Sequence, residues 1–203
     1  ELVALTSEIE AGRGDCGTEK MLAAAKSRSI PVSPLYDGLI QLGYGARQKR
    51  TQGIRTQLTG AVAEWSLAHS SLVAKLLASA GVPTRSDIPA SAPHFRLLVV
   101  GRTVAAGIRW EPPYFGNGHG GRPARATDVS ASIHPEVAAR ALDAARALSL
   151  DIAEIRIAAA DIGQPLETQE GAVSEIVSPV NGRISRPRDT FSNSNSTRSD
   201  VSR

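Results

Sequence analysis

The sequence of 203 residues has little cysteine and few aromatic residues, and both shortages limit what the chain can be. Cys16 is the only cysteine, so neither an intrachain disulfide nor a cysteine metal cluster can form, which favours a reducing compartment. Aromatic residues make up 4% of the chain and apolar residues 41%. Alanine, valine and leucine must therefore fill the core, which favours helices packed on a sheet over an aromatic-rich binding module.

The sequence also lacks a long apolar run and a strong excess of charge. No apolar stretch approaches the roughly 18 residues of a membrane span, and the first ten residues carry acids where a signal peptide carries lysine or arginine. We therefore expect a cytoplasmic chain that does not enter a membrane. The net charge of +3 is modest, and the cations from Arg47 to Arg55 lack interleaved aromatic residues that could stack on bases. A solvated face is favoured there over nucleic-acid binding.

The apolar pattern predicts an α/β or α+β fold. Pro135 suits the first turn of a helix, because its missing N–H is not needed there, and Gly81 followed by Pro83 is typical of a helix end. Helices are predicted at 1–10, 19–28, twice within 56–80 and from 135 onward, and strands at 39–42, 95–100, 103–109, 151–158 and 172–177. We expect residues 84–93 to form a linker and residues 111–123 a loop. The tail from residue 183 has almost no apolar residues and is predicted to be disordered.

Two blocks of the sequence carry a family resemblance. The first includes DGLIQLGYGARQKR at 37–50, in which an apolar pair precedes QLGYG and a basic run. The second contains FRLLVVGRTVAAGIR at 95–109, the pair Gly120–Gly121, and ATDVSASIHPEVAARALDAARALSLDIAEI at 126–155. Together they resemble the ATP-grasp region of cyanophycin synthetases, over most of the chain to about Gly182.

That resemblance implies an ATP-dependent ligase that joins a carboxylate to an amine through an acyl phosphate. Family members extend an aspartate backbone and attach arginine to it. ATP and Mg²⁺ would be the cofactors, and an amino acid or an aspartate/arginine polymer would be the partner. By position, Arg96 and Arg109 would contact the nucleotide phosphates, Gly120 and Gly121 would line the substrate side, and Glu175 would bind the metal. For each charged residue the alternative is an ordinary solvated charge, and no catalytic residue is assigned.

Several positions depart from the family pattern. Val177 stands where the family has an asparagine ligand, and Arg156 stands where it has an acid. We expect Glu154 not to replace that acid, because as an adjacent strand residue it would face the other way. The family's nucleotide-binding lid lies between the segments that correspond here to Pro83 and Phe95, and this short connection cannot form a subdomain. The resemblance thus implies a truncated and degenerate, incomplete ATP-grasp core.

Four segments follow from this comparison: an N-terminal helical segment at 1–34, a first block with its linker at 35–92, a second block at 93–182 and the tail at 183–203. The first hypothesis is a ligase of cyanophycin synthetase type that is impaired or inactive. The second is a non-catalytic remnant that binds a full-length relative, itself or another partner. The third is a chain that does not fold stably, and the sequence leaves open whether this chain is an enzyme.

Overall fold

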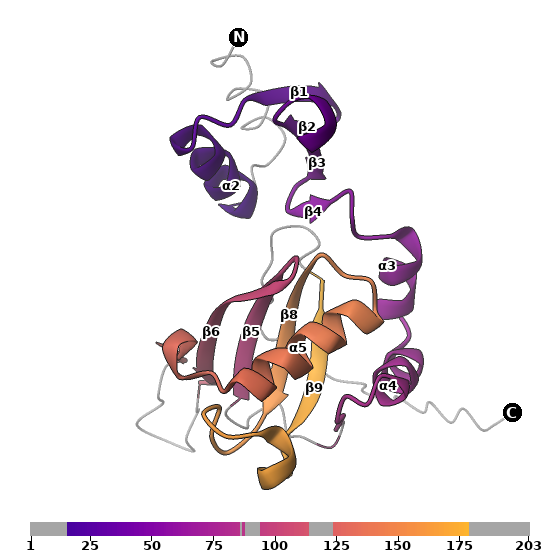
Figure 1. Ribbon diagram of the computed structural model, residues 1–203, viewed down its shortest axis with the longest axis vertical. Helices are drawn as coiled ribbons and strands as arrows, with labels where there is room; N and C mark the ends of the chain where they lie inside the picture. The colour runs from indigo at the N-terminus through magenta and orange to yellow at the C-terminus, as the bar shows by residue number, and fades with distance from the viewer. Residues whose placement is uncertain (1–15, 86, 88–93, 114–123, 179–203) are drawn as a thin grey trace, which may run out of the picture.

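The described part of the chain forms two antiparallel sheets. The computed structural model describes residues 16–85, 87, 94–113 and 124–178. The predicted helix at 1–10, the pair Gly120–Gly121 and the tail from residue 183 lie outside these residues. A four-stranded sheet has the order β1-β2-β3-β4, and a five-stranded sheet has the order β7-β6-β5-β8-β9 (Figure 1).

The smaller sheet follows the first described helix. The elements are α2 (Cys16–Ser27), β1 (Val32–Tyr36), β2 (Leu39–Leu42), the 3-10 turn η1 (Gly45–Arg47), β3 (Lys49–Gln52) and β4 (Arg55–Thr56). The predicted helix at 19–28 and the predicted strand at 39–42 are confirmed. The other three strands were not predicted. β1 contains Pro34, which is tolerated because β1 is an edge strand.

Two short helices connect the sheets. They are α3 (Ala61–Leu67) and α4 (Ser70–Ser79), so the predicted pair of helices with a break near residues 68–70 is confirmed. The first helix begins later than residue 56, because Arg55 and Thr56 pair with β3 instead. α4 ends before Gly81, whose φ of +69° is a left-handed conformation that glycine adopts without strain.

The larger sheet consists of β5 (His94–Val100), β6 (Thr103–Glu111), β7 (Arg125–Asp128), β8 (Ile152–Ala158) and β9 (Ala172–Val177). Every neighbouring pair in it is antiparallel. The predicted hairpin and the two later strands are confirmed, whereas β7 was not predicted. Two 3-10 turns, η2 (Ser130–Ser132) and η3 (Leu166–Gln169), lie in its connections.

Helix α5 (Pro135–Ala147) covers one face of the larger sheet, across which it runs in Figure 1. The ring of His134 accepts a hydrogen bond from the Glu136 N–H and caps the helix start. Small side chains on α5 and branched side chains on the sheet are almost fully buried together: Val137, Ala141, Ala144, Leu97, Val99, Ile155 and Ile157. Since side chains alternate along a strand, the residues between them project from the opposite face.

A hydrogen bond connects the two sheets. The Thr56 hydroxyl donates to Asp151 Oδ2 over 2.7 Å, and the Asp151 carbonyl accepts from the Gly101 N–H over 2.6 Å. Strand β4 is thereby held at the hairpin turn between β5 and β6. Among the helices that the structure describes, none is long and apolar enough to cross a membrane.

Candidate functional site

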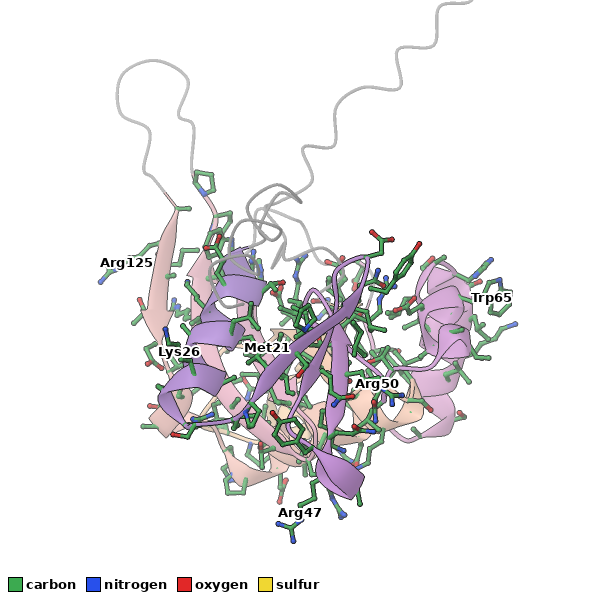
Figure 2. The ribbon with its side chains drawn as sticks, turned by 90° about the horizontal axis from the view of Figure 1, so that it is seen from above. Met21, Lys26, Arg47, Arg50, Trp65 and Arg125 are labelled. Carbon is green, nitrogen blue, oxygen red and sulfur yellow. The ribbon has the colours of Figure 1, made fainter. Side chains whose placement is uncertain are left out.

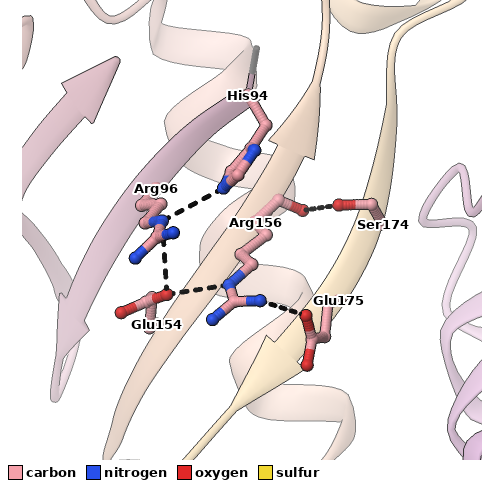
Figure 3. Close-up of polar contacts among 6 residues, drawn as sticks. All are labelled: His94, Arg96, Glu154, Arg156, Ser174 and Glu175. Atoms are coloured by element: carbon pink, nitrogen blue, oxygen red, sulfur yellow. Dashed lines mark hydrogen bonds and ion pairs between the residues drawn. The ribbon is translucent and has the colours of Figure 1, made fainter. Parts of the chain in front are cut away.

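The face of the larger sheet opposite α5 carries a row of charged and aromatic side chains. His94 and Arg96 come from β5, Glu154 and Arg156 from β8, and Glu175 from β9 (Figure 3). Arg96 and Arg156 are direct cross-strand partners, as are Arg156 and Glu175. Directly opposed residues share one face, so three strands together build this polar row.

Arg96, on β5, is almost fully buried, with 6% of its surface exposed. Its Nε donates to His94 Nε2 over 3.1 Å and lies 3.9 Å from Glu154 Oε1. Its guanidinium carbon lies 4.2 Å from the ring centroid of Trp110, a cation–π distance. Burial lowers the pKa of Arg96, because it disfavours the charged form, while the charge of Glu154 opposes that shift. The guanidinium is thus held by three neighbours.

Arg156 joins two carboxylates. Its Nε donates to Glu154 Oε1 over 2.9 Å, and its Nη1 forms a short ion pair with Glu175 Oε2. Ser174, at a β-bulge in β9, donates its hydroxyl to the Arg156 carbonyl over 3.2 Å. The expectation that Glu154 faces away from this site is wrong. Glu154 and Arg156 are two residues apart on β8, and positions two apart share a face.

The two arginines predicted to contact phosphates lie on opposite faces of the sheet. Arg109 pairs with Phe95, which faces the α5 core, whereas Arg96 pairs with Ile108. The Arg109 guanidinium lies 3.4 Å from Glu111, and about half of its side chain is exposed. The structure therefore does not bring Arg96 and Arg109 together. The predicted substrate residues Gly120 and Gly121 lie outside the described residues.

The donor set of the polar row does not fit a divalent cation. Such an ion requires several oxygen ligands around one point, but the space between Glu154 and Glu175 is bridged by the Arg156 guanidinium. Val177, the partner of Glu154 across the ladder, offers no ligand. Within the described residues, no group of three or more His, Cys, Asp or Glu side chains could hold a metal ion.

Sequence reasoning missed His94 and Trp110, which contact Arg96. The alternation of β5 could have placed His94 on the face of Arg96, since the two are two residues apart. Trp110 could be found only from the register between β5 and β6, in which it opposes His94. Glu154 Oε2 is buried and has no hydrogen-bond partner among the described residues, which the sequence did not indicate.

Comparison with solved structures identifies the fold. The chain is similar to the bifunctional glutathione synthetase from Pasteurella multocida, with a TM-score of 0.60 and 12% sequence identity over 79% of this chain. A weaker match, with a TM-score of 0.46 and 13% identity, covers 62% of this chain and 56% of the ATP-grasp ligase PsnB complexed with minimal precursor. No protein-family model and no curated protein sequence matches the chain.

The match to the glutathione synthetase shows that the chain has an α/β fold of ATP-grasp type, as the sequence resemblance implied. The chain spans 40% of the length of that synthetase. At 12% identity the similarity concerns the fold alone.

Proposed function

We propose that the chain is an ATP-dependent carboxylate–amine ligase of cyanophycin synthetase type whose ligase activity is impaired. The motifs around QLGYG and ATDV support the type, and the ATP-grasp fold supports the ligase kind. The bridging of Glu154 and Glu175 by Arg156 carries the proposal of impairment.

The positive charge of Arg156, which bridges Glu154 and Glu175, explains why this site would not support acyl-phosphate chemistry. An acyl-phosphate mechanism gathers negative charge on the transferred phosphoryl group, which Mg²⁺ ions neutralise. Here the Arg156 guanidinium forms ion pairs with both remaining carboxylates, those of Glu154 and Glu175. A cation brought to this place would meet the positive charge of Arg156 and find each acid already paired. Glu175 could therefore act as a metal ligand only in a variant in which Arg156 is replaced.

Arg96 remains the residue proposed to contact a phosphate, but its surroundings limit that role. Its guanidinium is buried against Trp110, His94 and Glu154. A phosphate would have to displace at least one of these neighbours to reach it. The short connection from Pro83 to His94 adds to the impairment, since it leaves no subdomain to close over a nucleotide.

A reconstruction experiment tests both halves of the proposal. We expect wild-type protein, given Mg-ATP, an aspartate acceptor and arginine, to release no ADP above background. In the double variant Arg156→Asp, Val177→Asn, the acid and amide positions are restored, and we expect millimolar Mg-ATP to raise its melting temperature by linkage. ADP release by the wild type that depends on the amino acids would contradict the impairment. A folded double variant that Mg-ATP does not stabilise would contradict the assignment of this face.

One observation favours the alternative of a non-catalytic interaction protein. Leu58, Val62 and Trp65 recur at helical spacing on and before α3, and their exposed fractions are 54%, 76% and 60%. Exposed apolar residues in such a group are typical of contact surfaces, and tryptophan is enriched among energetically important contacts. Figure 2 shows Trp65 at the outer side of its helix. Light scattering from 1 to 200 µM protein, with Trp65→Ser as the comparison, tests this: a strictly monomeric wild type that captures no full-length relative contradicts it.

A further inference from the structure

The smaller sheet carries a concentration of positive charge that the net charge of the chain conceals. Between Lys20 and Ala63 the sequence has seven lysines and arginines and one acid, Asp37, a net charge of +6 in a chain whose total is +3. Such an asymmetry within one part of a chain is a reason to look for an anionic partner. The position of each cation then decides whether the charges act together.

Backbone contacts bring several of these cations to one end of the sheet. The Gly43 N–H donates to the Pro31 carbonyl over 2.8 Å, which places the turn after β2 beside the segment that leaves α2. Lys49 opposes Leu42 at the same end of the β2–β3 ladder. The end of α2, with Lys26 and Arg28, and the segment after the turn, with Arg47 and Lys49, therefore lie at the same end of the sheet. Asp37 lies at the other end of β2, beyond Leu39.

Tyr44 lies within this group, in the turn between Gly43 and η1. Its exposed fraction is 69%, and Ile30, which precedes Pro31, is also exposed. Lys26, Arg28, Arg47 and Lys49 are all exposed, and in the described residues none of them forms an ion pair. Figure 2 shows Lys26 and Arg47 projecting outward from the smaller sheet and α2. We name these five residues (Lys26, Arg28, Tyr44, Arg47 and Lys49) the basic end.

Exposed cations at the same end of the sheet as an exposed aromatic ring match a specific kind of ligand. Arginine and lysine neutralise backbone phosphates, and the guanidinium fork suits phosphate oxygens. A tyrosine ring exposed among them offers a surface on which a base can stack. A carboxylate polymer would use the cations but would gain little from the ring. The sequence alone indicated a solvated face, because no aromatic residue lies within 47–55. In the structure the turn before η1 places the exposed Tyr44 at the same end of the sheet as Lys49.

We propose that the basic end binds single-stranded nucleic acid, with the four cations on the phosphates and Tyr44 stacked on a base. This inference is independent of the proposed ligase chemistry, because it uses the smaller sheet and not the polar row. The nucleic-acid proposal can therefore fail while the reconstruction experiment supports the ligase proposal. Equally, the ligase proposal can fail while nucleic-acid binding is found.

Fluorescence anisotropy of a labelled 20-nucleotide oligo(dT) tests the proposal on the full chain. The logarithm of the binding constant should fall with the logarithm of salt concentration with a slope near −3, since each of about four phosphate contacts contributes about −0.7. Arg47→Ala and Lys49→Ala should each reduce that slope by about 0.7. Tyr44→Ala should weaken binding about tenfold with little change of slope.

Arg125→Ala is the matched control, because Arg125 is an exposed arginine on β7 of the other sheet. It should bind as the wild type does. The proposal is overturned if no binding occurs at 50 mM salt, if Arg125→Ala weakens binding as much as Arg47→Ala, or if Tyr44→Ala has no effect. Equal competition by poly-glutamate at matched charge would assign the surface to acidic polymers instead. Circular dichroism of each variant confirms that it folds.

Discussion

Arg156 donates hydrogen bonds to Glu175, its direct partner across the β8–β9 ladder, and to Glu154 two residues earlier on β8. The cation thus lies between two carboxylates that come from different strands. Glu154 is buried, and its second oxygen has no hydrogen-bond partner in the described residues. Its negative charge therefore depends on Arg156, with Arg96 at 3.9 Å as the only other cation bridged to it in the described part of the chain.

Replacing Arg156 should destabilise the fold. Arg156→Met keeps the length of the side chain but leaves the carboxylate of Glu154 buried without its closest cation. Removing one partner of a buried pair costs roughly 3 kcal/mol of unfolding free energy, measurable by urea denaturation. Glu175→Gln is the control: the Glu175 side chain is 54% exposed, so that change should cost less than about 1 kcal/mol. Equal losses in the two variants would contradict the central role of Glu154.

The sequence predicted the apolar parts of the fold well. The hairpin of β5 and β6, strands β8 and β9 and helix α5 each have an apolar run or stripe. Gly101 marks the turn of the hairpin, and Pro135 marks the start of α5. Those signals are local, so they can be read without knowing what the segment packs against.

The polar strands and the polar row were not predictable in the same way. Strands β3 and β7 consist mostly of exposed polar residues, and β1 contains a proline, so none has an apolar pattern. The contacts of Arg96 depend on how β5, β6 and β8 are aligned, which is set by tertiary packing. The error over Glu154 had a different cause, because the two-residue period of β8 was sufficient to place it beside Arg156.

The stacking of Arg96 on Trp110 should be worth a measurable coupling energy. Arg96→Lys removes the planar group that lies over the ring and the fixed geometry of the bond to His94. We expect a loss of about 1–2 kcal/mol, and a double-mutant cycle with Trp110→Leu should give a coupling of about 1 kcal/mol. Additive losses, with no coupling, would show that the ring contributes only apolar packing.

Gly107 should not tolerate a side chain. A Cβ atom there would lie 2.7 Å from Ile133 Cδ1 and 2.9 Å from Leu97 Cδ2, both in the packed layer under α5. Gly107→Ala should lower the unfolding free energy by about 1–3 kcal/mol, because overpacking forces neighbours from their preferred rotamers. Gly60→Ala is the matched control, since no atom lies within 4 Å of its Cβ position. It should cost less than about 1 kcal/mol as a helix N-cap change. A wild-type melting temperature for Gly107→Ala would contradict this packing.

Asp128 should make stability depend on pH under acidic conditions. The Ser130 hydroxyl and the Ser130 N–H both donate to Asp128 Oδ1, over 2.6 Å and 2.8 Å. The hydroxyl contact, followed by the backbone contact, lowers the pKa of Asp128 below its usual value. A carboxyl with a lowered folded-state pKa stabilises the fold above the unfolded-state pKa of about 3.9 and loses that contribution as pH falls through the folded value.

Thermal unfolding of the wild type and of Asp128→Asn, measured from pH 6 to pH 2, checks this expectation. The difference in melting temperature between them should be constant above about pH 5 and should shrink below about pH 4. Parallel curves across the whole range would contradict the assigned shift.

The most direct test uses Mn²⁺, a paramagnetic substitute for Mg²⁺. Its binding shows whether the ion pairs of Arg156 with Glu154 and Glu175 keep a metal ion from this place. The amplitude of the free Mn²⁺ signal in electron paramagnetic resonance is measured with a non-hydrolysable ATP analogue, with and without protein. We expect the free Mn²⁺ signal to be the same with the analogue alone and with the analogue plus wild-type protein. The Arg156→Asp, Val177→Asn variant should reduce that signal. A reduction by the wild type that Glu175→Gln abolishes would contradict the account.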